Sequence, residues 1–592
     1  MSRSSWVLKS SLLLLALAAP AHAVEFRLLG EPLRLDITES LYLNYHGDPG
    51  NGDPAAVNYE ELMSRLNVQL AWRRWLVGVR WDAAAYPLSI PQVGDTATKA
   101  GCLDSNGQLL MPPPASDCVG KLEKNRFSPE GTLLNQGFPR FRQSLYDPRK
   151  VFEKFYLSYS SRTFDATFGD FYVNFGRGLV LSIRKVDELG VDTTLLGGKV
   201  ALHAGDLSAV AVAGWTNIQN VDETTATYIG DPYDFITGAH LDLRATGGTL
   251  VGGHVVYGQP NPCPVRNPDG AQPSCNEPQQ SDYYLRSGAT LDVPKLLPWL
   301  SLYGEYARAS DRIATKEKSG DAIYGAATAY LGRAVWLLEF KDYRSYRPWH
   351  SRNDPFGSLV YMQPPTLERF QTQLSSNSDI VAARLRVDLR VNSSLLLYAS
   401  AELGRLTPAE GITDTLYDFY AAAQLRWNQG RSHLFPLAGF RLEHDDTDHK
   451  IEEQLVATEW DAAQMIGGGW SVETQGLIWL RQKGDERVAG SGDNQWREGN
   501  LYVSLKSPAF ALSRHLRQTR FLLIGGYEFT TALLEEHNRH NFFNGALQWN
   551  ITPDTSLQLF AGGQRAGLKC ISGVCRYFPA FEGAKLILVF RL

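Results

Sequence analysis

The feature that most constrains this chain is a two-residue hydrophobic period that continues from Val24 to Leu592. In one typical segment, apolar residues alternate with mostly charged ones: Val381, Ala383, Leu385, Val387 and Leu389 against Ala382, Arg384, Arg386, Asp388 and Arg390. Successive side chains of a β-strand point to opposite faces, so such a segment has one apolar and one polar face. The sequence therefore predicts an all-β fold.

The alternating segments are long, and the connections between them differ in length. Soluble strands usually have about five or six residues, whereas a tilted membrane strand needs about 9 to 11. Tight turns such as 205–206, 247–248, 428–431 and 467–469 alternate with much longer connections. Short turns at one end and long loops at the other are typical of a transmembrane antiparallel β-barrel. A soluble sandwich or propeller, which would also alternate, does not account for these lengths.

The alternation predicts about 24 strands, with a range of 22 to 26, and an even count suits a single-chain bacterial barrel. The expected strands are 33–45, 58–72, 75–86, 150–161, 163–173, 195–204, 207–216, 233–246, 249–258, 282–293, 299–309, 320–332, 334–344, 379–391, 393–404, 415–428, 431–445, 451–466, 470–483, 494–507, 519–532, 540–551, 555–565 and 579–592.

The first 23 residues have the organisation of a signal peptide. Arg3 and Lys9 form a positive region, an apolar stretch follows, and Ala21-His22-Ala23 is an A-x-A cleavage site. The apolar stretch is too short to be a transmembrane anchor. We therefore expect a signal peptide over 1–23, cleaved after Ala23, and a single barrel domain over 24–592 in the outer membrane of a Gram-negative bacterium.

Composition excludes several other classes of protein. The net charge of -5 gives no electrostatic basis for binding nucleic acid. With 26 Tyr, 26 Phe and 14 Trp, the 592-residue chain has too many aromatic residues for a disordered protein. The motifs G-x-S-x-G, H-E-x-x-H and G-x-x-x-x-G-K-[ST] do not occur. We therefore expect neither an enzyme nor a cofactor, although catalysis at the barrel rim is a minority alternative.

Six cysteines fall in three local pairs, each inside one long connection. The pairs are Cys102 with Cys118, Cys263 with Cys275, and Cys570 with Cys575. Exported thiols oxidise, and no C-x-x-C or C-x-x-C-H motif suggests a metal or haem. The sequence therefore predicts three disulfides in outer loops.

Two stretches resemble a known family. The first is Gly169-Asp170-Phe171-Tyr172, then 175–179, 189–192 and Gly197-Gly198, and the second is 339–343 followed by 364–368. They are similar to an uncharacterised family of outer-membrane proteins, a domain of unknown function best represented in Bacteroidota. The last strand, with Leu586, Leu588 and Phe590, resembles the C-terminal strand recognised by the barrel-assembly machinery, but it ends in Leu592 where Phe is usual. The resemblance implies a barrel in the outer membrane and little about activity.

The connection 174–194 is the main candidate for a functional loop. It carries charged residues between paired glycines: Arg177, Arg184, Lys185, Asp187, Glu188 and Asp192. Porins narrow their channel with an inward-folded loop whose charges set selectivity. An outer hairpin with solvated charges is an equally good interpretation.

Two other connections carry chemistry-bearing residues. In 345–378 the aromatic and arginine residues are Tyr346, Arg347, Trp349, His350, Arg352, Tyr361 and Arg369. Such a set suits sugars or anionic ligands, but packing of the loop and pairing with lumen carboxylates is the favoured interpretation. At the 443–449 tip, His444, Asp446, Asp448 and His449 are weak candidates for metal ligands, and an exposed acidic turn is favoured.

The leading hypothesis is a porin-like channel or gated conduit for small solutes, narrowed by inward-folded loops. Arg384, Arg386, Asp388 and Arg390 would line a wet lumen that a barrel of this size cannot fill with side chains. Only about ten residues lie between Val24 and the first strand, which argues against a TonB-dependent transporter with a folded plug. The alternative is a scaffold or sheath for a secretion, adhesion, motility or electron-transfer complex. Expected partners are the bilayer, the assembly machinery and a periplasmic or surface protein.

Overall fold

The structure is a computed structural model of the chain. It describes residues 24–47, 59–85, 152–220, 231–261, 282–313, 316–349, 360–369, 378–407, 412–446, 451–484, 494–512, 518–532, 540–571, 574–578 and 580–592. These residues form strands almost throughout, with three short 3-10 turns, η2 (Asp187–Leu189), η3 (Thr246–Gly248) and η4 (Asn428–Gly430). None of the helices in this part of the chain is long and apolar enough to cross a membrane.

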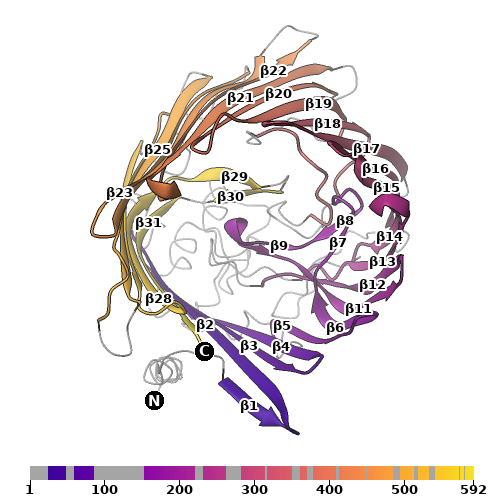
Figure 1. Ribbon diagram of the computed structural model, residues 1–592, viewed down its shortest axis with the longest axis horizontal. Helices are drawn as coiled ribbons and strands as arrows, with labels where there is room; N and C mark the ends of the chain where they lie inside the picture. The colour runs from indigo at the N-terminus through magenta and orange to yellow at the C-terminus, as the bar shows by residue number, and fades with distance from the viewer. Residues whose placement is uncertain are drawn as a thin grey trace, which may run out of the picture.

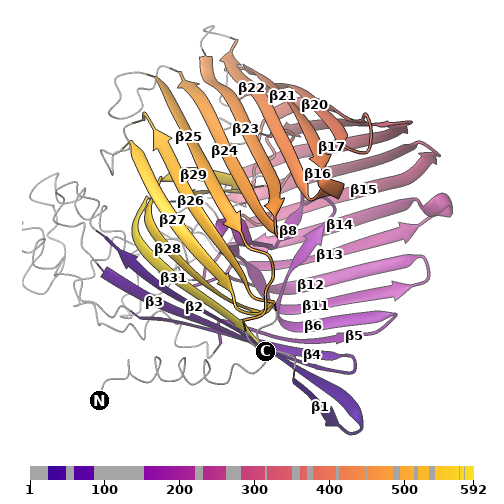
Figure 2. The same cartoon turned by 60° about the vertical axis from the view of Figure 1, so that its left-hand side comes forward.

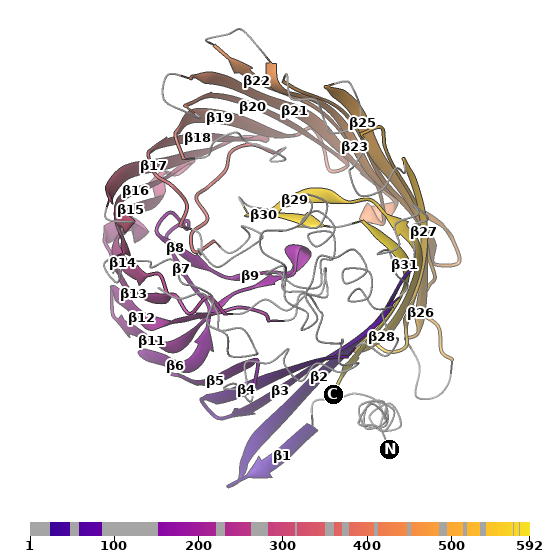
Figure 3. The same cartoon turned by 180° about the vertical axis from the view of Figure 1, so that it is seen from behind.

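The main sheet has 25 strands, of which 24 close into an antiparallel β-barrel (Figures 1 and 3). The barrel strands are β2 (Glu31–His46), β3 (Tyr59–Trp72), β4 (Trp75–Ala85), β5 (Lys154–Ser160), β6 (Phe164–Phe171), β11 (Thr194–Ala204), β12 (Leu207–Asn217), β13 (Phe235–Arg244), β14 (Leu250–Gln259), β15 (Tyr283–Leu297), β16 (Leu300–Ile313), β17 (Lys316–Leu331), β18 (Ala334–Arg344), β19 (Ile380–Arg390), β20 (Leu395–Leu406), β21 (Asp414–Trp427), β22 (Ser432–Asp445), β23 (Ile451–Gly467), β24 (Trp470–Lys483), β25 (Gln495–Lys506), β26 (Arg520–Thr530), β27 (Asn541–Asn550), β28 (Thr555–Gln564) and β31 (Phe581–Arg591). Each pairs with its neighbour along the chain, except at the points where shorter elements intervene.

The prediction of an all-β barrel with about 24 strands is confirmed. Each of the expected strands corresponds to one barrel strand, with ends that differ by a few residues, as for β5 (expected 150–161, observed Lys154–Ser160). Short turns join strands at one end of the barrel, and the long connections lie at the other. We call these the short-turn end and the long-loop end.

The barrel closes between its first and last strands. β31 pairs with β2 along Thr38–His46, with Tyr42 opposite Ile587, and with β28 on its other side. The short strand β1 (Val24–Leu28) pairs with the same edge of β2 further down, with Val24 opposite Leu35. It therefore covers the length of β2 that β31 leaves unpaired, and it extends beyond the ring at the short-turn end (Figure 2).

The outward surface of the barrel is apolar, as a membrane requires. Large apolar side chains point outward and are exposed, for example Leu241, Leu385 and Leu523. Aromatic residues gather near both ends: Trp75, Trp427 and Trp470 near the short-turn end, and Tyr45, Trp81, Trp215, Tyr257 and Phe543 toward the other. An apolar band between two aromatic girdles is the outer surface of a transmembrane barrel.

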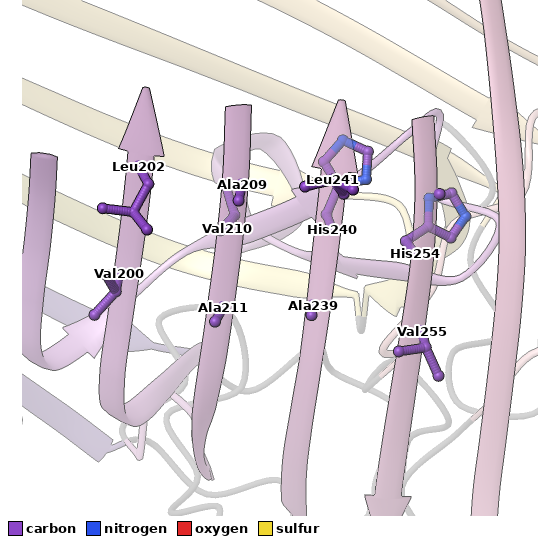
Figure 4. A pocket seen from close by; sticks show the side chains of 11 residues that line it. Val200, Leu202, Ala209, Val210, Ala211, Ala239, His240, Leu241, His254 and Val255 are labelled. Carbon is purple, nitrogen blue, oxygen red and sulfur yellow. The ribbon is translucent and has the colours of Figure 1, made fainter. Parts of the chain in front are cut away.

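Small side chains leave a shallow depression of about 460 Å³ across β11–β14. Ala209, Ala211, Ala239 and Gly253 lie here between larger apolar residues such as Leu202 and Leu241, and the rings of His240 and His254 occupy neighbouring strands (Figure 4). On this part of the wall the outward side chains are therefore short.

The largest apolar core lies inside the barrel, on the inner wall. Every strand from β11 to β21 contributes at least one buried apolar side chain to it: Leu195, Val212, Ile236, Val256, Tyr284, Ala307, Ala309, Ala322, Tyr324, Tyr343, Ile380, Ala382, Leu406 and Leu416. Of the remaining members, Phe171 is on β6 and Ile218 follows β12, and the others come from segments that fold into the lumen. In the middle of β12, at Val210 and Val212, the inward face is apolar as well, so the expectation of one polar face does not hold there.

Candidate functional site

The connection between β6 and β11 folds into the barrel. We call residues 172–193 the inward segment; it contains β7 (Val173–Phe175), β8 (Leu181–Ile183), β9 (Lys185–Val186), η2 and β10 (Val191–Asp192). Figures 1 and 3 show these elements inside the ring of strands. Leu179, Val180 and Leu181 at its centre are completely buried in the core of the inner wall.

Two glycines allow the inward segment to turn against the wall. Gly176 and Gly178 have φ values of 55° and 87°, a region that favours glycine. A Cβ on Gly176 would lie 2.6 Å from a carboxylate oxygen of Glu305, and one on Gly178 would lie 2.9 Å from the carbonyl oxygen of Gln363. Both positions therefore require the absence of a side chain.

A buried carboxylate on the inner wall binds this turn. The backbone N–H of Arg177 donates to Glu305 Oε2 at 2.7 Å, and the hydroxyl of Tyr303 donates to the same oxygen at 2.6 Å. The guanidinium of Arg177 lies over the ring of Tyr303, 4.5 Å from its centroid. The turn is held by hydrogen bonds and by a cation–π contact.

At its far end the inward segment is anchored by Asp192. Arg80 Nη1 and Lys154 Nζ each lie 2.6 Å from a carboxylate oxygen of Asp192, and the hydroxyl of Tyr172 donates to it at 2.6 Å. Burial alone would raise the pKa of Asp192, but the charges of Lys154 and Arg80 outweigh burial and hold this pKa well below its usual range. The carboxylate therefore stays ionised and paired with two cations of the wall.

A second carboxyl group beside this anchor has the opposite behaviour. Glu153 is 2 % exposed, and its Oε1 accepts a hydrogen bond from the backbone N–H of Asn220 at 2.9 Å. Burial, followed by the charges of Asp82 and Asp231, raises the pKa of Glu153 to about 8. Arg80, the cation that opposes this rise, is already bound to Asp82 and Asp192.

The connection after β18 also enters the lumen and binds the inward segment. Over residues 345–349 and 360–369 its aromatic side chains are buried: Tyr346, Trp349 and Tyr361. The hydroxyl of Tyr346 donates to the carbonyl of Leu179 at 2.8 Å, and the N–H of Ser182 donates to the carbonyl of Tyr361 at 2.9 Å. The two connections therefore form one layer on the inner wall.

A buried ion pair fixes this second connection to the barrel. Lys341 Nζ lies 2.6 Å from Glu368 Oε1, and both side chains are fully buried. Burial raises the pKa of Glu368, but the charge of Lys341 outweighs it and lowers the pKa below its usual range. Breaking such a pair leaves a buried charge, so the connection is strongly held.

A third element reaches the lumen from the opposite wall. The hairpin of β29 (Gly567–Ile571) and β30 (Val574–Phe578) folds inward between β28 and β31 (Figures 1 and 3). Phe578 packs against Val186 and Leu189 of the inward segment. The hairpin therefore meets the inward segment, which in turn contacts the connection after β18.

A belt of ionisable side chains crosses the inner wall at one level. Directly opposite one another on five consecutive strands are Glu339, Arg384, Glu402, Asp418 and Arg441. Glu402, Asp418 and Arg441 are at most 2 % exposed. The belt lies beside the Lys341–Glu368 pair, at the edge of the layer formed by the folded-in connections.

The six charged residues predicted for a constriction have different environments. Arg177 and Asp192 are bound to the wall as described. Lys185 and Asp187 form an exposed ion pair near the tip, and Arg184 is partly buried. The side chain of Glu188 lies outside the described part of the structure. The role of these residues in selectivity remains a prediction.

The four predicted lumen charges lie on β19. Arg384 Nε donates to Glu339 at 2.9 Å, and Arg386 Nε donates to Asp388 at 2.8 Å. Arg390 is exposed near the short-turn end. Among the predicted residues of 345–378, Arg369 pairs with Glu459, while His350 and Arg352 lie outside the described residues.

The predicted metal and disulfide sites are only partly described. His444 Nδ1 lies 3.8 Å from Asp446 Oδ1, and Asp448 and His449 fall outside the described residues. In the ranges that the structure covers, no group of three or more His, Cys, Asp or Glu side chains could hold a metal ion. Cys102, Cys118, Cys263 and Cys275 are not covered, whereas Cys570 and Cys575 occupy opposite positions in the β29–β30 hairpin. The three disulfides stay predictions.

Sequence reasoning missed the wall residues that bind the folded-in connections, above all Arg80, Lys154, Glu305 and Lys341. One signal could have found some of them. Charged residues two positions apart on the lumen face recur near the long-loop end: Arg80 with Asp82, Glu339 with Lys341, and Arg441 with Glu443. Residues i and i+2 of a strand share a face, so each pair predicts a polar cluster on the wall.

Comparisons with known proteins give two kinds of likeness. A family model described as a family of unknown function (DUF6029) matches residues 135–244. This range contains the first stretch on which the family resemblance was based and does not reach the second one. No curated protein matches the chain.

Several solved structures are similar in fold. A BenF-like porin from Pseudomonas fluorescens Pf-5 covers 72% of this chain and 96% of its own length, with a TM-score of 0.36 and 8% identity. OccK2 (OpdF) of Pseudomonas aeruginosa covers 77% and 98%, with a TM-score of 0.35 and 9% identity. The siderophore receptor PirA of the same species covers 94% and 80%, with a TM-score of 0.42 and 7% identity. Identities this low leave no residue correspondence from which a role could be transferred.

Proposed function

We propose that this protein is an outer-membrane channel for small solutes, and that its folded-in connections limit what passes. The observation that carries the proposal is the layer of outer connections held on the inner wall by buried ion pairs, above all Arg80–Asp192 and Lys341–Glu368. Wall side chains cannot fill a barrel of this strand number, so the connections decide how much of the lumen stays open.

The alternative of a scaffold needs an apolar surface in the lumen for a partner. The inner wall of β11–β21 carries an apolar core, but the chain's own connections cover it, with Leu179 and Tyr361 completely buried there. This observation does not favour the scaffold.

The test is single-channel conductance of the purified barrel in planar bilayers. In the variant, a two-residue Asn-Gly turn replaces residues 187–190, which shortens the tip but keeps β9 paired with β10. The variant loses the contact between Leu189 and Phe578, so we expect a higher conductance than in the wild type.

The control shortens the turn at 428–430, at the short-turn end, and we expect wild-type conductance from it. If the tip variant conducts like the wild type, the tip does not limit passage. If wild type and variant both pass no current, the channel proposal is wrong.

A further inference from the structure

The inner wall has two chemically different parts. From β11 to β21 it carries the apolar core that the folded-in connections cover. The segment 360–369 ends beside β21, where the guanidinium of Arg369 lies 5.7 Å from the ring centroid of Tyr420. The second part of the wall runs from there through β28 and has a different composition. On this second part aromatic rings and neutral amides lie on the lumen face among charged side chains such as Arg441, Glu453 and Arg481.

The aromatic residues form one patch. Tyr398, Tyr420, Phe435 and Trp479 are partly exposed and pack on the buried Ala422, Leu437, Leu455 and Ala457. The rings of Tyr398 and Phe435 meet edge to face, with centroids 5.8 Å apart. Ring faces that stay partly exposed on a lumen wall can stack on a solute.

Next to this patch, amide side chains line the following strands. They are Gln475, Asn500, Asn544, Gln548 and Gln558, and each is at least partly exposed. Gln475 lies opposite Tyr502 in the sheet, and Tyr502 and Asn544 both lean over Gly526, whose missing side chain leaves room for them. An amide supplies two donors and an acceptor, which suits a ligand rich in hydroxyl groups.

Several charged side chains of this region form pairs of opposite sign. Arg369 is bound to Glu459, Lys506 lies 3.9 Å from Glu473, and Arg565 is bound to Glu498. Such pairs largely cancel each other's field on a passing solute. These paired charges therefore do not require a solute of opposite charge.

We propose that the lumen wall of β20–β28 is a binding path for neutral saccharides, with the rings of Tyr420 and Trp479 stacking on sugar faces and the amides binding the hydroxyl groups. The proposal rests on the proposed channel function and names the solute class of that channel. An aromatic carboxylate that uses the same rings and Arg386 is the competing ligand.

The test measures block of the ion current by cellotetraose and, separately, by benzoate. We expect cellotetraose to block the wild type at a lower concentration than benzoate. Trp479→Ala and Tyr420→Ala should each raise the half-blocking concentration about three- to ten-fold, since one stacking contact is lost. Gln475→Leu should also raise it, whereas Phe543→Ala, an exposed aromatic residue on the membrane side, should not.

Titration calorimetry of cellotetraose into the detergent-solubilised barrel separates the two proposals. If the barrel passes no current but binds saccharide, and Trp479→Ala weakens that binding, the binding path is supported and the channel proposal is wrong. Stronger block by benzoate, or block that neither aromatic variant changes, would overturn the saccharide proposal. A silent barrel that binds no saccharide overturns both. Two aromatic variants are used so that poor folding of one does not decide the outcome.

Discussion

At the scale of single residues, the ends of the inward segment depend on buried charges in one cluster. Arg80 binds both Asp82 and Asp192, and Lys154 binds Asp192. Glu153, in contact with the next connection through Asn220, faces Asp82 and Asp231. A buried carboxyl group that faces two other carboxylates makes the stability of the cluster depend on pH.

The pH dependence has a definite sign. Burial and the two neighbouring carboxylates raise the pKa of Glu153 from 4.5 to about 8, so the folded protein holds this proton more tightly than the unfolded chain. The contribution of Glu153 to stability is therefore fully present below pH 4.5 and is lost as the pH rises to about 8. The slope is at most about 1.4 kcal/mol per pH unit.

We expect Glu153→Gln to flatten the decline in unfolding temperature between pH 5 and pH 8.5. Unfolding in detergent, followed by circular dichroism, measures this. Glu317→Gln, at an exposed position of the long-loop end, is the control and should keep the wild-type slope. If Glu153→Gln leaves the decline of the unfolding temperature with pH unchanged, the raised pKa of Glu153 does not cause that decline.

At the scale of elements, the turn at 176–178 decides whether the inward segment reaches the wall. Gly176→Ala puts a side chain at a positive φ and within 2.6 Å of Glu305, so we expect it to lower the free energy of unfolding by about 1–3 kcal/mol. Gly198→Ala is the matched control, because nothing lies within 4 Å of its added Cβ. Equal stability of the two variants would show that the contact with Glu305 is not needed.

The strands could be predicted from the sequence, but the contacts of the inward segment could not. Alternation is local, so it predicts β19 from residues such as Leu385 and Arg386 alone. Asp192 was recognised as a charged residue of a candidate loop, yet its partner Arg80 is 112 residues away, and the pairing of β4, β5, β6 and β11 brings the two together. A local sequence pattern cannot predict a contact between residues so far apart in the chain.

The apolar inner wall was missed for a related reason. Val210 and Val212 on β12 point into the barrel, where a wet lumen would require polar residues. They can lie there because the inward segment covers them. Its residues Leu179 and Val180 belong to the same apolar core and shield the two valines from water. Apolar residues on both faces of a predicted strand would have indicated a covered wall.

At the scale of the whole molecule, closure depends on one seam. β31 pairs with β28 on one side and β2 on the other, so without it two strands would each expose an unpaired edge. We expect deletion of residues 581–592 to abolish the compact, heat-sensitive form that folded barrels show on gel electrophoresis. Deletion of 24–28 removes only β1 and should keep that form. A compact form in the first deletion would contradict closure through β31.

The largest apolar core of this protein lies where its solutes would travel. In most proteins a weakened core shows itself as unfolding or aggregation, whereas here we expect the closed ring of strands to persist while the layer inside it loosens. Under the proposed function, loss of packing energy around Leu179 or Tyr361 then shows itself first as leakage through an intact barrel. Uptake of a large antibiotic such as vancomycin by living cells would therefore rank core variants by stability without any purification.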